Sequence, residues 1–153
     1  MKITLSIDSK ESIEIGHMDL ASIVSWLDDD VQHAFFYSRL AKHHASEVRS
    51  AIAGKASLPL DVLVELAGDA SIEVVRQLAN NQRALKLFEL PLIQKMIIRD
   101  VSVADEIADN LYRVSKLVRD GVIQALLQHT DPKVAEKAEN FVCDTDEFDC
   151  DEE

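Results

Sequence analysis

The chain has 153 residues, 47% of them hydrophobic and 5% aromatic, and its formal net charge is −12. This length fits one domain, and the few aromatic, Gly and Pro residues are typical of a helical core. No apolar run approaches the roughly 20 residues of a membrane span and no signal peptide is visible, so we expect a cytoplasmic protein that does not bind membranes. The acidic charge disfavours direct nucleic-acid binding, which needs clustered Lys and Arg, and favours a partner with a basic surface.

The acidic charge is concentrated at the C-terminus. Seven Asp and Glu residues lie in residues 144–153, which leaves a formal charge of −5 for residues 1–143. We predict a single helical-repeat domain over residues 1–143 and a disordered acidic tail over residues 144–153. Cys143 and Cys150 lie in or beside this tail. In a reducing compartment we expect free thiols, and a disulfide between the two is the alternative.

Two short segments near the N-terminus alternate apolar and polar residues. Residues 2–7 and 12–15 have this pattern, with polar residues 8–11 between them. The alternation predicts a small β-hairpin within residues 1–16. An isolated hairpin is marginal in water, so we expect it to pack on the helices or to pair with a second chain.

From residue 18 to residue 143 the apolar residues recur at helical spacing, which predicts stacked helices. The first covers residues 18–27, with Trp26 at the edge of the core. The second begins near Val31 and either continues through His43-His44 or breaks there before residues 46–53. Its inward side chains are predicted to be Ala34, Phe35, Leu40 and Ala41. Further helices are predicted between residues 92 and 100, between 100 and 111, over 114–128, and after Asp131-Pro132.

Residues 58–81 have the pattern of a complete helical hairpin. Pro59 is tolerated in the first turn of a helix, Gly68 ends that helix, and Ser71 can cap the next one. The predicted inward residues are Leu60, Leu63, Leu66 and Ala67 in the first helix and Ile72, Val75, Leu78 and Ala79 in the second. Because two short amphipathic helices cannot bury their apolar faces alone, the hairpin needs stacked neighbours.

The second helices of successive hairpins share a degenerate pattern. Ala53, Ala79, Ala108 and Ala138 occupy equivalent positions, separated by 26, 29 and 30 residues. A small side chain lets stacked helices approach closely, and a nearly constant spacing of helical pairs indicates an α-solenoid. The alternative is an irregular helical bundle in which alanine recurs by chance.

These features resemble HEAT-like repeats, including the bacterial leucine-rich-repeat variants. Asp69 with Arg76, and Asp131 with Lys137, are similar to the inter-helix Asp and the second-helix basic residue of that family. The resemblance covers about residues 44–142. It implies a mainly α fold, a short right-handed α-solenoid of helical hairpins carrying the small N-terminal β-hairpin, and a scaffold that binds proteins or other macromolecules.

Several polar residues are candidates for partner binding or for contacts between repeats. Arg49 and Arg76 occupy equivalent positions and either pair with Asp or carbonyl groups of a neighbouring repeat or bind an anion on a shared face. Asn80, Asn81, Asp109 and Asn110 end their helices, where asparagine tolerates a left-handed conformation, and could alternatively form a polar binding rim. Since Phe35, Phe36 and Tyr37 cannot all face one core, Phe36 and Tyr37, with Trp26, are candidate interface aromatics.

The sequence contains no recognisable catalytic, cofactor-binding or metal-binding motif. Adjacent His43 and His44 point about 100° apart on a helix, so they cannot chelate one ion together. The acidic stretch after Cys143 fails as a calcium loop because Phe148 falls at a ligand position. No glycine-rich phosphate loop, nucleophile elbow or zinc-protease motif is present.

We therefore predict a non-enzymatic adaptor or scaffold that binds another protein through the face made by its second helices. The N-terminal hairpin would cap one end of the stack, and a homodimer would cover that end equally well. One alternative is an acidic mimic of nucleic acid that presents Asp28–Asp30 and the tail to a nucleic-acid-binding protein. The other is an enzyme resembling the HEAT-like DNA glycosylases, which would require a basic concave face.

Overall fold

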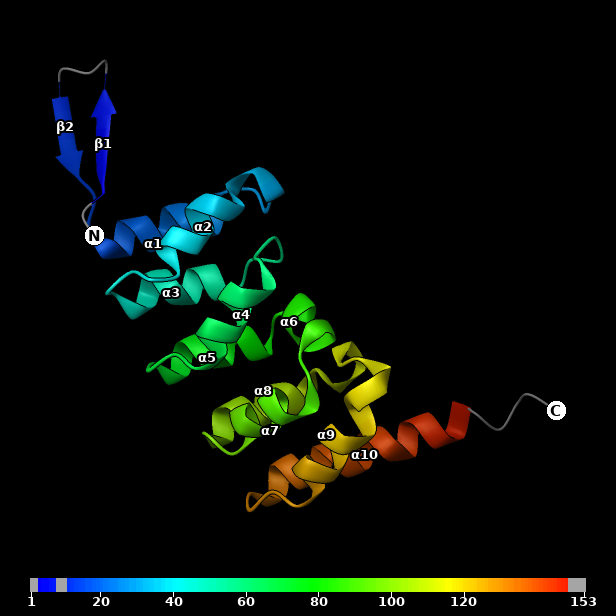
Figure 1. Ribbon diagram of the computed structural model, residues 1–153. Coiled ribbons are helices and arrows are strands. Elements are labelled where there is room, and N and C mark those ends of the chain that lie inside the picture. The colour runs from blue at the N-terminus through cyan, green and yellow to red at the C-terminus, as the bar shows by residue number, and fades with distance from the viewer. Residues whose placement is uncertain (1–2, 8–10, 149–153) are drawn as a thin grey trace. The chain divides into compact units, whose positions relative to one another are not determined.

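The computed structural model describes residues 3–7 and 11–148 (Figure 1). Within these residues the chain is mainly α, with ten α-helices that pack sequentially, two 3₁₀ turns and two short strands. The chain divides into two compact units, Met1–Leu78 and Ala79–Glu153, and each is described by itself. None of the helices in the described part has the length and apolar character needed to cross a lipid bilayer.

The N-terminal strands β1 (Thr4–Ile7) and β2 (Glu11–Glu14) pair antiparallel. Thr4 lies opposite Glu14, and the pairing continues at the base, where the Ile15 N–H donates to the Ile3 carbonyl at 2.9 Å. This agrees with the alternation in the sequence, and the intervening residues 8–10 lie outside the described part. Ile13 is 61% exposed, so its side chain is not covered by the helices.

The N-terminal unit is built around α3, which packs against α1, α2 and α4. The elements are α1 (His17–Trp26), the 3₁₀ turn η1 (Val31–His33), α2 (Ala34–Leu40), α3 (Ser46–Ala53), α4 (Leu60–Ala67) and α5 (Ile72–Ala79). The helix that begins near Val31 does not continue through His43-His44. It breaks there, and α3 begins at Ser46, which was the second of the two alternatives for this segment. In α4 the buried face contains Val62 with Leu63, Leu66 and Ala67, whereas Leu60, predicted to be inside, is 47% exposed.

Two charged side chains hold the loops of this unit in place. The buried Lys55 Nζ donates to the Leu27 carbonyl at 2.6 Å, at the C-terminal end of α1, where a cation is favoured by the helix dipole. The Asp29 carboxylate accepts hydrogen bonds from the backbone N–H groups of Ala56 and Ser57. The loop after α1 and the loop after α3 are thus tied together by charge-assisted hydrogen bonds.

In the C-terminal unit, helices pack both on their neighbours in sequence and on the next helix but one. The elements are α6 (Gln82–Leu87), α7 (Leu90–Ile97), α8 (Val101–Asp109), the 3₁₀ turn η2 (Leu111–Arg113), α9 (Lys116–Leu127) and α10 (Pro132–Phe148). α7 contacts α8 and α9, and α8 contacts α9 and α10. The hairpin α7/α8 therefore stacks on the hairpin α9/α10, with α7 against α9 and α8 against α10.

The last helix extends farther than the composition predicts. α10 continues through Asp144 to Phe148, inside the segment expected to be disordered from residue 144. Each residue added to an existing helix gains a hydrogen bond without the cost of a new nucleus, which composition alone does not take into account. Residues 149–153 of the predicted tail, including Cys150, lie outside the described residues.

Candidate functional site

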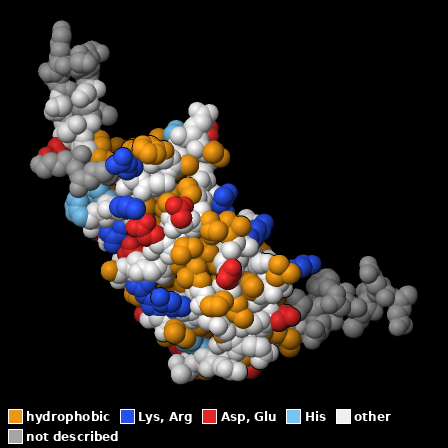
Figure 2. Space-filling view, viewed as in Figure 1, with side chains coloured by type: hydrophobic (Ala, Val, Ile, Leu, Met, Phe, Trp, Pro, Cys, Tyr) orange, Lys and Arg blue, Asp and Glu red, His pale blue; other side chains and the backbone are white. Residues whose placement is uncertain are grey.

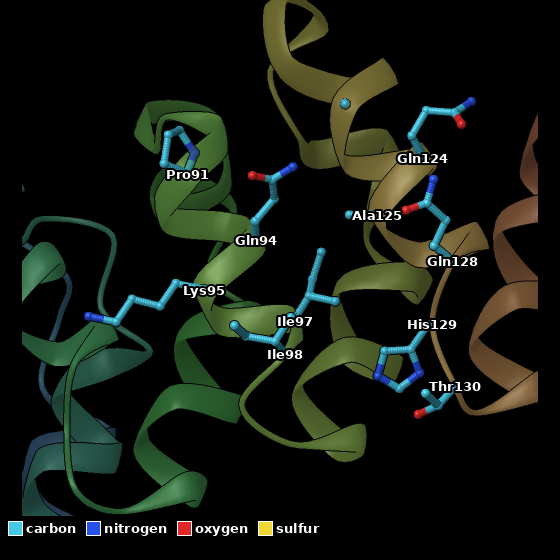
Figure 3. Close-up of a pocket in the computed structure, with 11 residues that line it drawn as sticks. Pro91, Gln94, Lys95, Ile97, Ile98, Gln124, Ala125, Gln128, His129 and Thr130 are labelled. Atoms are coloured by element: carbon cyan, nitrogen blue, oxygen red, sulfur yellow. The ribbon is translucent and has the colours of Figure 1, made fainter.

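A groove of about 860 Å³ lies between α7 and α9 in the C-terminal unit (Figure 3). α7 and the residue after it contribute Pro91, Gln94, Lys95, Ile97 and Ile98, and α9 and the residue after it contribute Gly121, Gln124, Ala125 and Gln128. Ile97 is buried and forms part of the floor, whereas Ile98 is 81% exposed at one end. The site is thus an open channel with an apolar floor.

Helical spacing explains why α9 presents this face. Gly121, Ala125 and Gln128 recur at intervals of four and three residues, so they share one side of the helix. Leu117, four residues before Gly121, extends the same row and is 95% exposed. The other side of α9 carries Val122, Ile123 and Leu126, which are buried in the unit.

Gly121 sets the distance between the two helices. A Cβ atom at this position would lie 2.5 Å from Cδ2 and 3.0 Å from Cδ1 of Leu90, the first residue of α7. Only a residue without a side chain lets Leu90 pack directly on the α9 backbone. The glycine therefore closes the groove at the N-terminal end of α7.

Two amide side chains face the gap from opposite sides. Figure 3 shows Gln94 on α7 and Gln128 at the end of α9 directed toward the space between the helices, and Lys95 and Gln124 also line the groove. Each amide offers two N–H donors and one carbonyl acceptor without a net charge. The peptide group offers the complementary donor and acceptor, so the two glutamines can hydrogen-bond to a bound main chain.

His129 closes the groove at the end of α9. Its Nδ1 lies 3.1 Å from the backbone nitrogen of Asp131 and accepts that N–H, so the ring is fixed and Nε2 carries the proton of the neutral form. No Asp or Glu is among the groove residues, in a chain whose net charge is −12. No carboxylate of the groove would therefore repel an acidic ligand, and an uncharged ligand would leave no carboxylate there without a counter-ion.

The two arginines predicted at equivalent positions have different surroundings. Arg49 donates from Nε and Nη2 to the two carboxylate oxygens of Asp69, at 2.6 and 2.8 Å. Arg76 pairs with Glu73 of its own helix at 2.8 Å, and this hydrogen bond holds the pKa of Glu73 below its ordinary value. The structural alternative thus holds for Arg49, which joins two neighbouring helical hairpins.

The asparagines cap or join helix ends, though not in a left-handed conformation. Asn81 Oδ1 accepts the N–H groups of Arg83 and Ala84 at the start of α6, and Asn110 follows α8 with a φ of −111°. The prediction that Asn110 is left-handed is therefore wrong, because its amide instead donates to the carbonyl of Glu106 one turn back, at 2.8 Å. Such side-chain bonds satisfy a helix end without a positive φ.

Asn80 and Asp109 take part in ion pairs or hydrogen bonds between segments of the C-terminal unit. Arg113 Nη1 donates to the carbonyl and to Oδ1 of Asn80, both at 3.0 Å. Lys137 on α10 pairs with Asp105 and Asp109 on α8 at 2.6 and 2.8 Å. Although burial favours the neutral amine, these two carboxylates hold the pKa of Lys137 above its ordinary value.

The aromatic residues are placed differently from the sequence prediction. Tyr37 is fully buried, and its hydroxyl donates to the Asp28 carbonyl at 2.9 Å, so it is not an interface residue. Phe35, predicted inside, is 74% exposed beneath the guanidinium of Arg39, and Trp26 is 89% exposed rather than at the core edge. Phe36 is partly exposed. Hydrophobic side chains of this kind reach the visible surface among charged ones (Figure 2).

Sequence reasoning placed the binding face on the second helices, and it missed the α7–α9 groove on first helices. The signal was present in the spacing of Gly121, Ala125 and Gln128, but glycine in a helix was not recognised as a close-approach site. A second, shallower hollow of about 550 Å³ lies on α1, α3 and α5 and is lined mainly by small or polar residues such as Ser22, Ser50 and Gln77. This hollow includes the second helices α3 and α5.

In the described residues, no group of three or more His, Cys, Asp or Glu side chains is arranged to hold a metal ion. Comparison with models of protein families, with curated protein sequences and with solved structures found no match to this chain.

Proposed function

We propose that this chain is a non-enzymatic helical-repeat adaptor, a short right-handed α-solenoid of HEAT-like hairpins, that binds a segment of another protein in the α7–α9 groove. The groove carries the proposal. It combines an apolar floor with neutral amides facing the gap, on helices whose other sides are already packed. Grooves of this composition suit polypeptide, which has both apolar side chains and main-chain hydrogen-bonding groups.

The repeat architecture is supported by the packing of the second helices. Ala53, Ala79, Ala108 and Ala138 are all at most 6% exposed, as expected where a small side chain allows close helix contact. In the C-terminal unit, α7 packs on α9 and α8 on α10, which is the nearest-neighbour contact pattern of stacked hairpins. Arg49 and Asp69 supply one ion pair between successive hairpins.

An acidic mimic of nucleic acid is less well supported. Such a protein must present free carboxylates, yet Asp29 binds the backbone of Ala56 and Ser57, and Asp30 accepts the N–H of Gln32. Two of the three acidic residues in that run therefore serve the fold. The net charge of −12 still favours a basic partner, because long-range attraction speeds association.

Ala125→Arg tests the proposal, because the longer side chain would fill the groove. The full chain, the A125R variant and Gln82→Arg would be used as baits in a native lysate, with bound proteins identified by mass spectrometry. Gln82→Arg is the matched control: it adds the same charge to the same unit, at an exposed residue of α6 that does not line the groove.

We expect a partner that the wild type and Q82R retain and that A125R loses. Deleting residues 149–153 should leave this binding unchanged, whereas an acidic mimic should lose affinity and salt sensitivity together. If every captured protein binds A125R as well as the wild type, the groove is not the binding site and the proposal is overturned.

A further inference from the structure

We infer that two copies of this chain associate through strand β1, the open edge of one copy pairing antiparallel with the same edge of the other about a two-fold axis at Leu5. This association goes beyond the proposed function and does not depend on it, because β1 belongs to the N-terminal unit and the groove to the C-terminal unit. The open edge of β1, the direction of its backbone groups and the order of its residues support the pairing.

One edge of β1 is open. β1 pairs with β2 along its other edge, and in the part of the chain that the structure describes no third strand joins this sheet (Figure 1). Ile13 on β2 is 61% exposed, so the helices do not cover the hairpin at this residue. A two-stranded hairpin is marginal in water, and a strand added to the open edge stabilises it through main-chain hydrogen bonds.

The hydrogen bonds between β1 and β2 fix which backbone groups point to the open edge. The Ile15 N–H donates to the Ile3 carbonyl at 2.9 Å, so these two residues form a hydrogen-bonded pair of the antiparallel ladder. Because hydrogen-bonded and non-hydrogen-bonded pairs alternate along the ladder, Thr4 and Ser6 direct their N–H and C=O groups away from β2, to the open edge. A strand that pairs with this edge therefore hydrogen-bonds to Thr4 and Ser6.

The residues on the two sides of Leu5 are chemically matched. Residues 2–8 read Lys-Ile-Thr-Leu-Ser-Ile-Asp, of which Lys2 and Asp8 lie outside the described residues. Two copies paired antiparallel about Leu5 set hydroxyl opposite hydroxyl, aliphatic opposite aliphatic and cation opposite anion: Thr4 opposite Ser6, Ile3 opposite Ile7, and Lys2 opposite Asp8. Cross-strand pairs of these kinds stabilise a sheet, and the two-fold axis makes each pair occur twice.

The neighbouring registers match less well. Centred on Thr4, the pairing would set Lys2 opposite Ser6 and leave the lysine without a counter-charge. Centred on Ser6, it would set Lys2 opposite Lys10, and like charges directly opposite each other destabilise a sheet. Charge complementarity therefore favours the register about Leu5.

Strand β2 limits the association to two copies. The two-fold pairing of β1 leaves a β2 strand on each outer edge of the combined sheet, and β2 begins at Glu11 and ends at Glu14. A symmetric pairing of β2 centred on Ser12 or Ile13 would set Glu11 opposite an isoleucine. Centred on Glu14, it would set two carboxylates opposite each other. Because charged residues on an edge strand discourage further pairing, we expect a closed dimer.

Ser6→Pro tests which edge is used, because proline removes an N–H that points to the open edge and that β2 does not use. Ser12→Pro is the matched control, since Ser12 lies directly opposite Ser6 and its N–H points to the outer edge of β2. Sedimentation velocity of the full chain at a series of concentrations gives the dimer dissociation constant of each protein. We expect the wild type and S12P to dimerise alike and S6P to remain monomeric. A monomeric wild type, or an S6P protein that dimerises as tightly as the wild type, would overturn the inference.

A charge exchange tests the register without proline. Lys2→Asp and Asp8→Lys each set like charges opposite each other in both symmetry-related pairs, so each should weaken the dimer about tenfold. The double variant K2D/D8K restores the opposite charges and should recover the dissociation constant of the wild type. A double variant that dimerises no better than the two single ones would show that Lys2 and Asp8 do not meet, and the pairing about Leu5 would be wrong.

Discussion

Arg49 and Asp69 form a bidentate ion pair, Nε to Oδ2 at 2.6 Å and Nη2 to Oδ1 at 2.8 Å, although they lie twenty positions apart in the sequence. Both side chains are largely buried, at 14% and 9% exposure. Arg49 also donates to the carbonyls of His43 and His44, and Asp69 accepts the Ser71 N–H. The pair thus joins the loop before α3 to the turn between α4 and α5, and the hydrogen bond to Asp69 raises the pKa of Arg49.

Asp69→Asn should destabilise the N-terminal unit by about 2–3 kcal/mol, because it leaves the Arg49 guanidinium partly buried without its counter-ion. The measurement is hydrogen exchange of the α3 and α5 amides in the full chain under native conditions. Glu65→Gln is the matched control, since the Lys42–Glu65 pair is exposed, at 65% and 53%, and should contribute about 0–0.5 kcal/mol. Equal effects of the two substitutions would contradict the structural role of Asp69.

Acid should destabilise the N-terminal unit partly through Asp29. Burial raises the pKa of this carboxyl, but hydrogen bonds from Ser57 and Ala56 and the charge of Lys55 outweigh it and lower the pKa below its ordinary value of 3.8. Because the folded pKa lies below the unfolded one, the stabilisation is present above the unfolded value and is lost as the pH falls through the folded pKa. Asp29→Asn should therefore be less stable at neutral pH and lose less stability on acidification.

The measurement is urea unfolding followed by the helical circular dichroism signal, at a series of pH values between about 5 and 2. Asp28→Asn is the control, since Tyr37 and His33 contact the Asp28 backbone carbonyl rather than its carboxylate. A D29N protein whose stability follows pH as steeply as the wild type would show that this carboxylate does not stabilise the fold.

The close approach of α7 and α9 at Gly121 can be measured with a double-mutant cycle. Gly121→Ala gains helix propensity of about 1 kcal/mol, but its Cβ would lie 2.5 Å from Leu90 Cδ2, so Leu90 must move. In a Leu90→Ala background the same substitution should be stabilising by about 0.5–1 kcal/mol, because the obstructing side chain is gone. Urea unfolding of the four proteins gives the coupling energy, and a value of zero would mean that Gly121 does not set the helix spacing.

The parts of the fold that local chemistry determines could be predicted from the sequence. Pro59 and Gly68 bound the helix Leu60–Ala67, and the next helix begins at Ile72, directly after Ser71. The mainly α class and the position of most helices follow from the same apolar spacing and breakers. Arg49 and Arg76 recur at equivalent positions, which allowed two alternatives, and pairing with an Asp of a neighbouring hairpin was one of them.

Features that depend on distant contacts could not be predicted. The orientation of α2 follows from the Tyr37 hydroxyl bond to the Asp28 carbonyl, so Tyr37 is buried and Phe35 is outside, the reverse of the prediction. The α7–α9 groove depends on the distance between two helices, which Gly121 and Leu90 set by contact. No local pattern in the sequence identifies the partner in either contact, Asp28 for Tyr37 or Leu90 for Gly121.

The burial of Lys55 has a chemical consequence. The residue is 8% exposed and its amine is bound to the carbonyls at the end of α1. Acylating reagents that readily modify surface lysines such as Lys42 should therefore reach it only when this part of the chain opens. The rate at which Lys55 becomes labelled therefore measures how often this part of the N-terminal unit opens, and it can be measured on the unsubstituted protein.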